Sequence, residues 1–278
     1  METAYDKIMK VKGMEEMKLL ASRMKLAAEN RDRLGLDAVP LPDFLFAEAP
    51  GSGITTHLHL FAELLEELNL MSFQGEKKVV EQVLDDRFQP ILDTVRDAAG
   101  FHNEFRGVVG VEIRDHSSSG AASEELQRLI DFARDKQEEI LFVFICRLEN
   151  DAAPRWLVKK LSLALPLEVI HFPSLTVEEL VYYTEGFLRR QGFELSEEAA
   201  RYLADVMPKL QAVDGFDGLR SIDTMVSLLI YQACATRKME IRVITQEMIE
   251  TLLEGGYMNQ LSVLSPKVTR KIGFGGAD

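Results

Sequence analysis

The sequence predicts an α/β protein in which a parallel sheet is sandwiched by helices and a small all-helical domain follows. Up to residue 173, short apolar runs typical of buried strands alternate with helical patterns, which indicates parallel strands joined by helices. From residue 174 onwards the patterns are helical only. The chain of 278 residues, 46% of them hydrophobic, is long enough for one large domain and one smaller domain.

These patterns divide the chain into four segments. We expect an N-terminal helical segment over residues 1–35, the α/β domain over 36–173, the helical domain over 174–254 and a loose tail over 255–278. A glycine and two prolines separate the first segment from the second.

The expected strands are runs rich in apolar and β-branched residues. They cover residues 44–46, 78–84, 107–113, 140–146 and 168–172. The third run, GVVGVEI, and the fourth, ILFVFIC, are apolar throughout most of their length, which is typical of strands that are buried on both faces of a sheet.

The expected helices have apolar residues at helical spacing. They cover parts of residues 5–35, 58–68, 90–99, a segment that begins at Ser123, and residues 156–165, 177–191, 196–207, 219–237 and 246–254. Ser123 is expected to cap the helix that follows it. Thr176 and Glu179 have the spacing of a capping box at the start of the helical domain.

Composition excludes several classes of function. The formal net charge of -13 repels a phosphate backbone, so we expect no nucleic-acid partner. The two cysteines, Cys146 and Cys234, lie in apolar segments and are expected to be buried small hydrophobes, not disulfide or metal-binding residues. No apolar run approaches eighteen residues and the N-terminus lacks a hydrophobic signal core, which predicts a cytoplasmic protein with no membrane contact.

One stretch has the context of a phosphate-binding loop. The sequence FLFAEAPGSGITT, residues 44–56, runs from an apolar strand through a glycine turn into a helix. The pattern of such loops is G-x-x-x-x-G-K-[ST]. Glu48 stands where the pattern has its first glycine, and Ile54 stands where it has its lysine.

The order of segments resembles AAA+ ATPases, and more specifically the branch of the stage V sporulation protein K and the red-type rubisco activase. The likeness covers about residues 7–254 and rests on VKGMEEMK, the helix up to GLD, APGSGITT, GVVGVEI, ILFVFIC, HFPSLTVEEL and RRQGFELSEEAA. It implies a P-loop NTPase sheet with a helical lid domain, and a site for ATP with Mg²⁺.

The resemblance also implies which residues would form that site. The nucleotide would contact Pro50, Gly51, Ser52, Gly53, Ile54, Thr55 and Thr56 in the loop, and Arg220, which matches the lid arginine in the sequence GLRSID. Thr55 and Glu112 match the positions that hold magnesium. The alternative for Arg220 is a surface ion pair with Asp217 or Asp223.

Several positions depart from the family pattern. Ile54 lacks the lysine charge, and the loss of one charge-assisted hydrogen bond costs roughly 1.5 to 3 kcal/mol. Ile113 replaces the glutamate that activates water, so we expect no catalytic residue. The stretch LALPLEVIHF has no arginine finger, and Phe88 in DDRFQP lacks the glycine of a pore loop. Asn150 is the candidate for a polar sensor at the end of the fourth strand.

Two further positions have alternatives. Asp115 could be proposed as a substitute for the missing glutamate, although a solvated loop aspartate is the simpler interpretation. His57 and His59 are two apart on a helix and point away from each other, so they are not expected to bind one metal.

Together these features predict a degenerate AAA+ protein, a pseudo-ATPase that serves as a structural or regulatory subunit. It would bind ATP weakly or not at all and would not hydrolyse it by the usual route. Its partners would be proteins, including other AAA+ subunits in a ring. The alternatives are an active AAA+ ATPase that remodels a protein partner, and an interaction scaffold that binds no nucleotide.

Overall fold

The computed structural model describes residues 2–74, 77–84, 105–114, 120–137, 139–213, 215–235 and 242–257. It divides into two compact units, Met1–Ser174 and Leu175–Asp278. The expected helix over 90–99, Phe88, Asp115 and the tail beyond residue 257 lie outside the described residues.

Two helices precede the sheet. Helix α1 spans Ala4–Lys10 and begins with a capping box, in which the Asp6 backbone N–H donates to Thr3 Oγ1 at 3.1 Å. Helix α2 spans Glu15–Leu34 and ends at Gly35, which has a left-handed φ of 65°. Both helices belong to the first unit. Helix α1 is joined to the helix that follows the first strand by an ion pair between Lys7 and Glu63, 2.9 Å apart.

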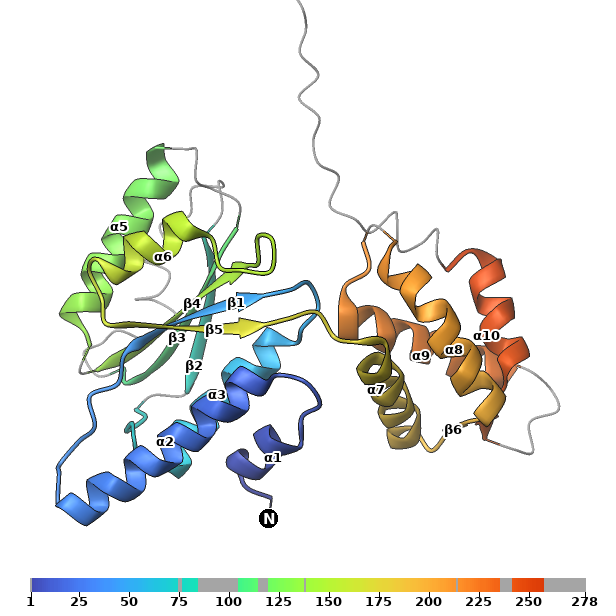
Figure 1. Cartoon of the computed structure of the whole chain (residues 1–278), viewed down its shortest axis with the longest axis horizontal. Coiled ribbons are helices and arrows are strands. Elements are labelled where there is room, and N and C mark those ends of the chain that lie inside the picture. The colour runs from blue at the N-terminus through green and yellow to red at the C-terminus, as the bar shows by residue number, and fades with distance from the viewer. Residues whose placement is uncertain are drawn as a thin grey trace, which may run out of the picture. The chain divides into compact units, whose positions relative to one another are not determined.

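Five parallel strands form the sheet of the first unit (Figure 1). They are β1 (Asp43–Glu48), β2 (Val79–Leu84), β3 (Gly107–Ile113), β4 (Ile140–Arg147) and β5 (Leu167–Phe172). Their order is β2-β3-β4-β1-β5, which places the most apolar strands in the middle. The five strands that the sequence predicts are confirmed, each within a few residues.

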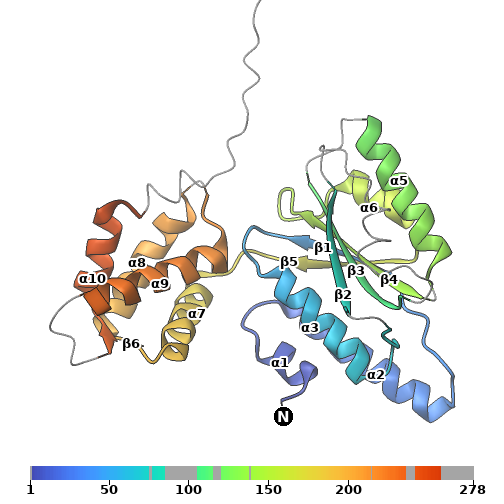
Figure 2. The same ribbon diagram turned by 180° about the vertical axis from the view of Figure 1, so that it is seen from behind.

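Helices cover both faces of this sheet (Figures 1 and 2). Helix α3 (Ile54–Glu67) lies with α2 on one face, and α5 (Gly120–Asp135) lies with α6 (Arg155–Ser162) on the other. Trp156, the one tryptophan of the sequence, lies half exposed on α6.

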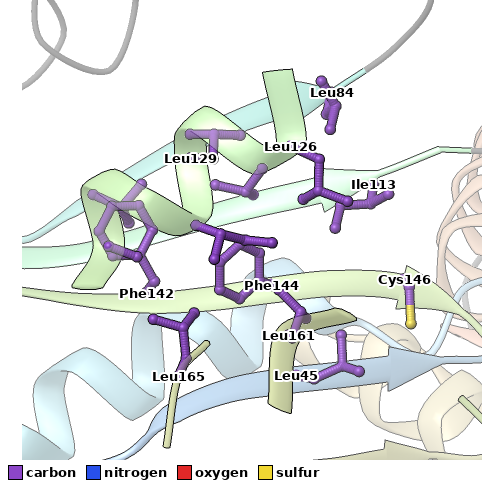
Figure 3. Packing of buried hydrophobic residues seen from close by; sticks show 14 of the residues in the cluster. Leu45, Leu84, Ile113, Leu126, Leu129, Phe142, Phe144, Cys146, Leu161 and Leu165 are labelled. Atoms are coloured by element: carbon purple, nitrogen blue, oxygen red, sulfur yellow. The ribbon is translucent and has the colours of Figure 1, made fainter. Parts of the chain in front are cut away.

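Successive side chains along each strand point to opposite faces of the sheet, so a hydrophobic core forms on each face. Toward α5 and α6, a cluster of buried residues includes Leu45, Phe142, Phe144, Leu129 and Leu161 (Figure 3). Toward α3, four phenylalanines pack against one another with ring centroids 5.0 to 6.2 Å apart, namely Phe44, Phe46, Phe61 and Phe172. A sheet buried on both faces explains the unbroken apolar runs of its central strands.

Within its described residues, the second unit is helical apart from one pair of two-residue strands. Its elements are α7 (Val177–Arg190), β6 (Glu194–Leu195), α8 (Glu197–Gln211), α9 (Gly218–Ala235), β7 (Val243–Ile244), α10 (Gln246–Leu252) and a π-helical turn η1 (Leu253–Tyr257). The predicted capping box of α7 is confirmed, since the Glu179 N–H donates to Thr176 Oγ1 at 3.2 Å and the Thr176 N–H donates to Glu179 Oε2 at 2.8 Å. Tyr257 is buried, and its hydroxyl donates to the Ser221 carbonyl at 2.6 Å.

Two local expectations are wrong. Helix α5 begins at Gly120, so Ser123 lies inside it and does not cap it; the Ser123 hydroxyl and carbonyl instead accept hydrogen bonds from Lys160. Cys146 is buried as expected, but Cys234 is exposed because it lies on the outward side of α9, next to exposed Ala235. Of the helices that the structure describes, none combines the length and the apolar character needed to span a membrane.

Candidate functional site

The topology of the sheet points to the carboxyl end of β1. From β1 the chain enters α3 on one face of the sheet, whereas from the neighbouring β4 it enters α6 on the other face. In open parallel sheets, ligands bind outside the carboxyl ends of strands where the direction of winding reverses in this way. The loop between β1 and α3, residues 49–53, lies at that point.

Two glycines shape the loop. Gly51 has a φ of 69° and Gly53 a φ of 84°, both in the left-handed region that favours glycine. Gly53 is the N-cap of α3, and no side chain caps this helix. The N–H groups of its first turn therefore have no intrahelical partner and face outward along the axis, which is the backbone geometry that binds phosphate.

The carboxylate of Glu48, at the end of β1, is bonded to this loop. The Ser52 hydroxyl, in a residue only 1% exposed, donates to Glu48 Oε2 at 3.1 Å. The Ser52 N–H donates to the Ala49 carbonyl at 3.2 Å and closes the turn. Glu48, the last residue of β1 and the first position of the P-loop pattern, is thus bonded to the loop by its side chain.

His57 supports the loop from the next turn of α3. Its backbone N–H and its Nδ1–H both donate to the Gly53 carbonyl, at 3.2 and 2.8 Å. Burial lowers the pKa of His57, against the opposing effect of the Gly53 hydrogen bond, so the ring is neutral at pH 7. Its Nε2 has no hydrogen-bond partner among the described residues. The ring packs against Phe172, with centroids 5.5 Å apart.

The remaining loop positions carry no charge. Pro50, Thr55 and Thr56 are exposed, and Ile54 is half buried at the position of the lysine. The threonine hydroxyls are neutral donors and acceptors, so they cannot supply the charge that a lysine gives to a phosphate. The loop has the backbone of a phosphate site without its cation.

The predicted magnesium position on β3 is occupied by an ion pair. Arg114 donates from Nε and from a terminal nitrogen to the two carboxylate oxygens of Glu112, at 2.6 and 2.8 Å. β3 is separated from β1 by β4, which puts Glu112 roughly 10 Å from the loop strand at ordinary strand spacing. Ile113 is 6% exposed and packs in the core beside α5, so it offers nothing to a water molecule.

Two more positions that can bear polar chemistry are Cys146, near the end of β4, and Asn150, in the turn that follows it. Burial, together with the nearby charges of Glu149 and Glu48, raises the pKa of Cys146 to about 12, so its thiol is neutral and unreactive at pH 7. Asn150 and Asp151 have φ values of 50° and 60° in a two-residue turn closed by backbone bonds between Glu149 and Ala152. This turn explains the type of residue at the candidate sensor position without any ligand.

Arg220 belongs to the second unit. Its guanidinium donates to Asp217 at 3.0 Å, and its side chain is 85% exposed. This is the surface ion pair that the sequence offers as the alternative to a nucleotide contact. Its predicted contact with a nucleotide stays a prediction.

The described residues contain no group of three or more histidine, cysteine, aspartate or glutamate side chains that could hold a metal ion. His57 is buried and His59 is exposed, where it bonds to Glu81 at 3.1 Å. ATP with Mg²⁺ fits the backbone of the loop but not its charges, because Glu48 is negative, Ile54 is apolar and Glu112 is already paired with Arg114.

Solved structures with a similar backbone include three mutants of RuvB from Thermotoga maritima, an AAA+ ATPase. They align with 92% of this chain and 72% or 73% of their own, with TM-scores of 0.56 or 0.57 and sequence identities of 14% to 17%. This chain has the AAA+ P-loop NTPase fold. No protein-family model matches the sequence, and no curated protein matches it. At these identities the likeness to RuvB shows the AAA+ fold alone.

Sequence reasoning missed two bonds made by charged side chains at this site, the Glu112–Arg114 pair and the Glu48–Ser52 bond. Arg114 could have been found, because residues two apart on a strand share a face and Glu112 and Arg114 have opposite charges. The Glu48–Ser52 bond had no such signal, since it depends on the path of the loop between them.

Proposed function

We propose that this protein is a degenerate AAA+ subunit, a pseudo-ATPase related to the branch of stage V sporulation protein K and red-type rubisco activase. It acts as a structural or regulatory partner of other proteins, including AAA+ subunits in a ring. It binds ATP weakly or not at all and has no catalytic residue for hydrolysis.

One observation carries the proposal: the charges of the site are reversed or cancelled while its backbone is kept. The glycine conformations and the uncapped start of α3 remain, but a carboxylate lies in the loop and the Glu112 carboxylate is paired with Arg114. A fold that is retained around an altered site supports a role in assembly more than a role in turnover.

The direct test is to measure Mg-ATP binding by calorimetry and phosphate release with the purified protein. We expect no phosphate release above background and at most weak binding. Phosphate release that disappears in Gly53→Val, which the left-handed φ of Gly53 should not tolerate, would overturn the proposal.

Restoring the missing charges of the site distinguishes the active-ATPase alternative from the pseudo-ATPase proposal. Ile54→Lys alone and together with Arg114→Ala, which frees Glu112, should raise Mg-ATP affinity if the site is a relic. If a different cationic side chain already binds the phosphates in place of the lysine, the same changes should leave the affinity for Mg-ATP unchanged or lower it. Ile113→Glu is a poor test, because it would place a carboxylate at a position only 6% exposed.

The scaffold alternative, with no nucleotide binding at all, is favoured by the Glu48 carboxylate in the loop. It predicts that no nucleoside triphosphate changes the unfolding temperature. A specific rise with Mg-ATP that is absent with Mg²⁺ alone would exclude it.

A further inference from the structure

Helix α6 has apolar side chains on both of its faces. Leu157 and Leu161 face the sheet and are fully buried. With about 3.6 residues per turn, five residues fall on the opposite side and form the outer face of α6: Arg155, Trp156, Lys159, Lys160 and the C-cap residue Leu163. On this outer face Trp156 is 37% exposed and Leu163 is 79% exposed.

The charges of the outer face are all positive. Residues 152–167 contain three cations and no aspartate or glutamate, in a chain whose formal net charge is -13. Lys160 donates to the carbonyl and the hydroxyl of Ser123 on α5, at 3.0 and 3.1 Å. Arg155 and Lys159 form no hydrogen bond or ion pair with any residue that the structure describes. No described carboxylate therefore pairs with the cations of this face.

The helix itself does not need these side chains. Lysines in the last turn stabilise a helix because their charge complements its dipole, but Arg155 stands at the first position, where positive charge is unfavourable. Cations alone would fit a solvated face. A single exposed apolar residue is ordinary on a surface, but here a tryptophan and a leucine lie seven residues apart on one face, among cations.

The size of the outer face fits a short segment of a partner. A helix of eight residues is about 12 Å long. It is too short to supply the roughly 800 Å² that a stable interface takes from each partner. A second copy of this chain would therefore need further contacts, whereas one helix of a partner protein would not.

The charge of the outer face indicates an acidic partner of limited extent. A nucleic acid or an anionic membrane is an extended polyanion and would meet the net charge of -13 as well as the local cations. A short helix contacts only the local cations, because charges beyond about 8 to 10 Å are screened by salt.

We propose that the outer face of α6 is a docking site for an acidic amphipathic helix of a partner protein. Trp156 and Leu163 contact the apolar side of that helix, and Arg155 and Lys159 pair with its carboxylates. The inference rests on the proposed function and deepens it, because it names the surface and the chemistry of the partner.

The test is calorimetric titration of the whole chain with a designed helical peptide of about 16 residues, in which leucines at helical spacing are flanked by glutamates. A matched peptide has lysine in place of each glutamate. We expect the glutamate peptide to bind about tenfold more tightly than the lysine peptide, and less tightly as salt is added. The nitrogen-15 spectrum of the protein has one indole signal, that of Trp156, which the glutamate peptide should shift.

Variants of exposed residues test the place of binding. Trp156→Ala, Leu163→Ser and Lys159→Glu should each weaken binding of the glutamate peptide about fivefold or more. The matched controls are Leu26→Ser on α2 and Lys209→Glu on α8, which make the same changes at exposed positions elsewhere and should leave the affinity unchanged. Unfolding curves of all variants show that each is folded.

The inference is overturned if the glutamate peptide does not bind, if the lysine peptide binds as tightly, if the indole signal does not shift, or if the controls lose as much affinity as the outer-face variants. It is also overturned if phosphatidylserine vesicles or a single-stranded oligonucleotide bind more tightly than the glutamate peptide. Each of these results leaves the pseudo-ATPase proposal standing, since that proposal ends only on ATP turnover by the wild type.

Discussion

Asp43 is a carboxyl group buried at the start of β1, with 2% of its surface exposed. Its Oδ1 accepts from the Phe142 N–H at 3.0 Å, and so ties the first residue of β1 to β4. Burial raises the pKa of Asp43 from 3.8 to about 6, against the opposing hydrogen bonds from Phe142 and Gln137. The Asp43 carboxyl therefore binds its proton more tightly in the folded state than in the unfolded state.

This pKa predicts that stability falls as the pH rises. Below pH 3.8 both states hold the proton; between pH 3.8 and about 6 only the folded state holds it; above that, the folded state contains a buried charge. The penalty at pH 8 is about 3 kcal/mol by linkage. Asp43→Asn should therefore be more stable than wild type at pH 8 by up to this amount.

Urea unfolding of wild type and Asp43→Asn at pH 4 and pH 8 measures the effect. The two proteins should differ little at pH 4 and most at pH 8. An equal difference at both pH values would mean that Asp43 does not titrate as proposed.

Glycines on β3 set how closely the elements around this strand can pack. A Cβ added at Gly107 would lie 2.8 Å from the Lys78 carbonyl oxygen, which belongs to the backbone and cannot move aside. A Cβ added at Gly110 would lie 2.5 Å from Cδ2 of Leu58 on α3, which is the end of a flexible side chain. An added methyl group at Gly110 can therefore be accommodated by a change in the Leu58 rotamer, whereas one at Gly107 requires the backbone to move.

We expect Gly107→Ala to destabilise the fold more than Gly110→Ala. Overpacking typically costs about 1 to 3 kcal/mol, and Gly107→Ala should lie at the upper end because the backbone at Lys78, just before β2, must shift. Thermal unfolding of both variants tests this order. A larger loss in Gly110→Ala would show that Leu58 cannot change its rotamer.

At the scale of elements, the sequence predicts the strands better than the site. The run at 107–113 matches β3 because a strand buried on both faces has a purely local signature. The start of α5, the strand pair β6–β7 and the exposure of Cys234 were not predicted, since each depends on contacts with residues distant in the sequence. The Glu48–Ser52 and Asp43–Phe142 bonds depend on the folded chain in the same way.

At the scale of the whole molecule, each of the two units has buried residues of its own. The cluster beside α5 and α6 is drawn wholly from residues 45–165, inside the first unit. The second unit has its own buried residues, such as Leu203, Met225 and Leu229. A unit with its own core can fold by itself.

We therefore expect a chain of residues 1–174 to fold without the second unit. Circular dichroism should show a cooperative thermal transition for this fragment, because it keeps the sheet and the described helices that cover it, α2, α3, α5 and α6. A fragment without a cooperative transition would show that the first unit needs the second.

Trp156 gives this chain a built-in optical probe of one unit. As the one tryptophan of the sequence it lies on α6, so its fluorescence reports the first unit, whereas the far-ultraviolet signal sums the helices of both. In a single denaturant titration, coincident curves would mean that the units unfold together. Separated curves would give the stability of each unit without any label.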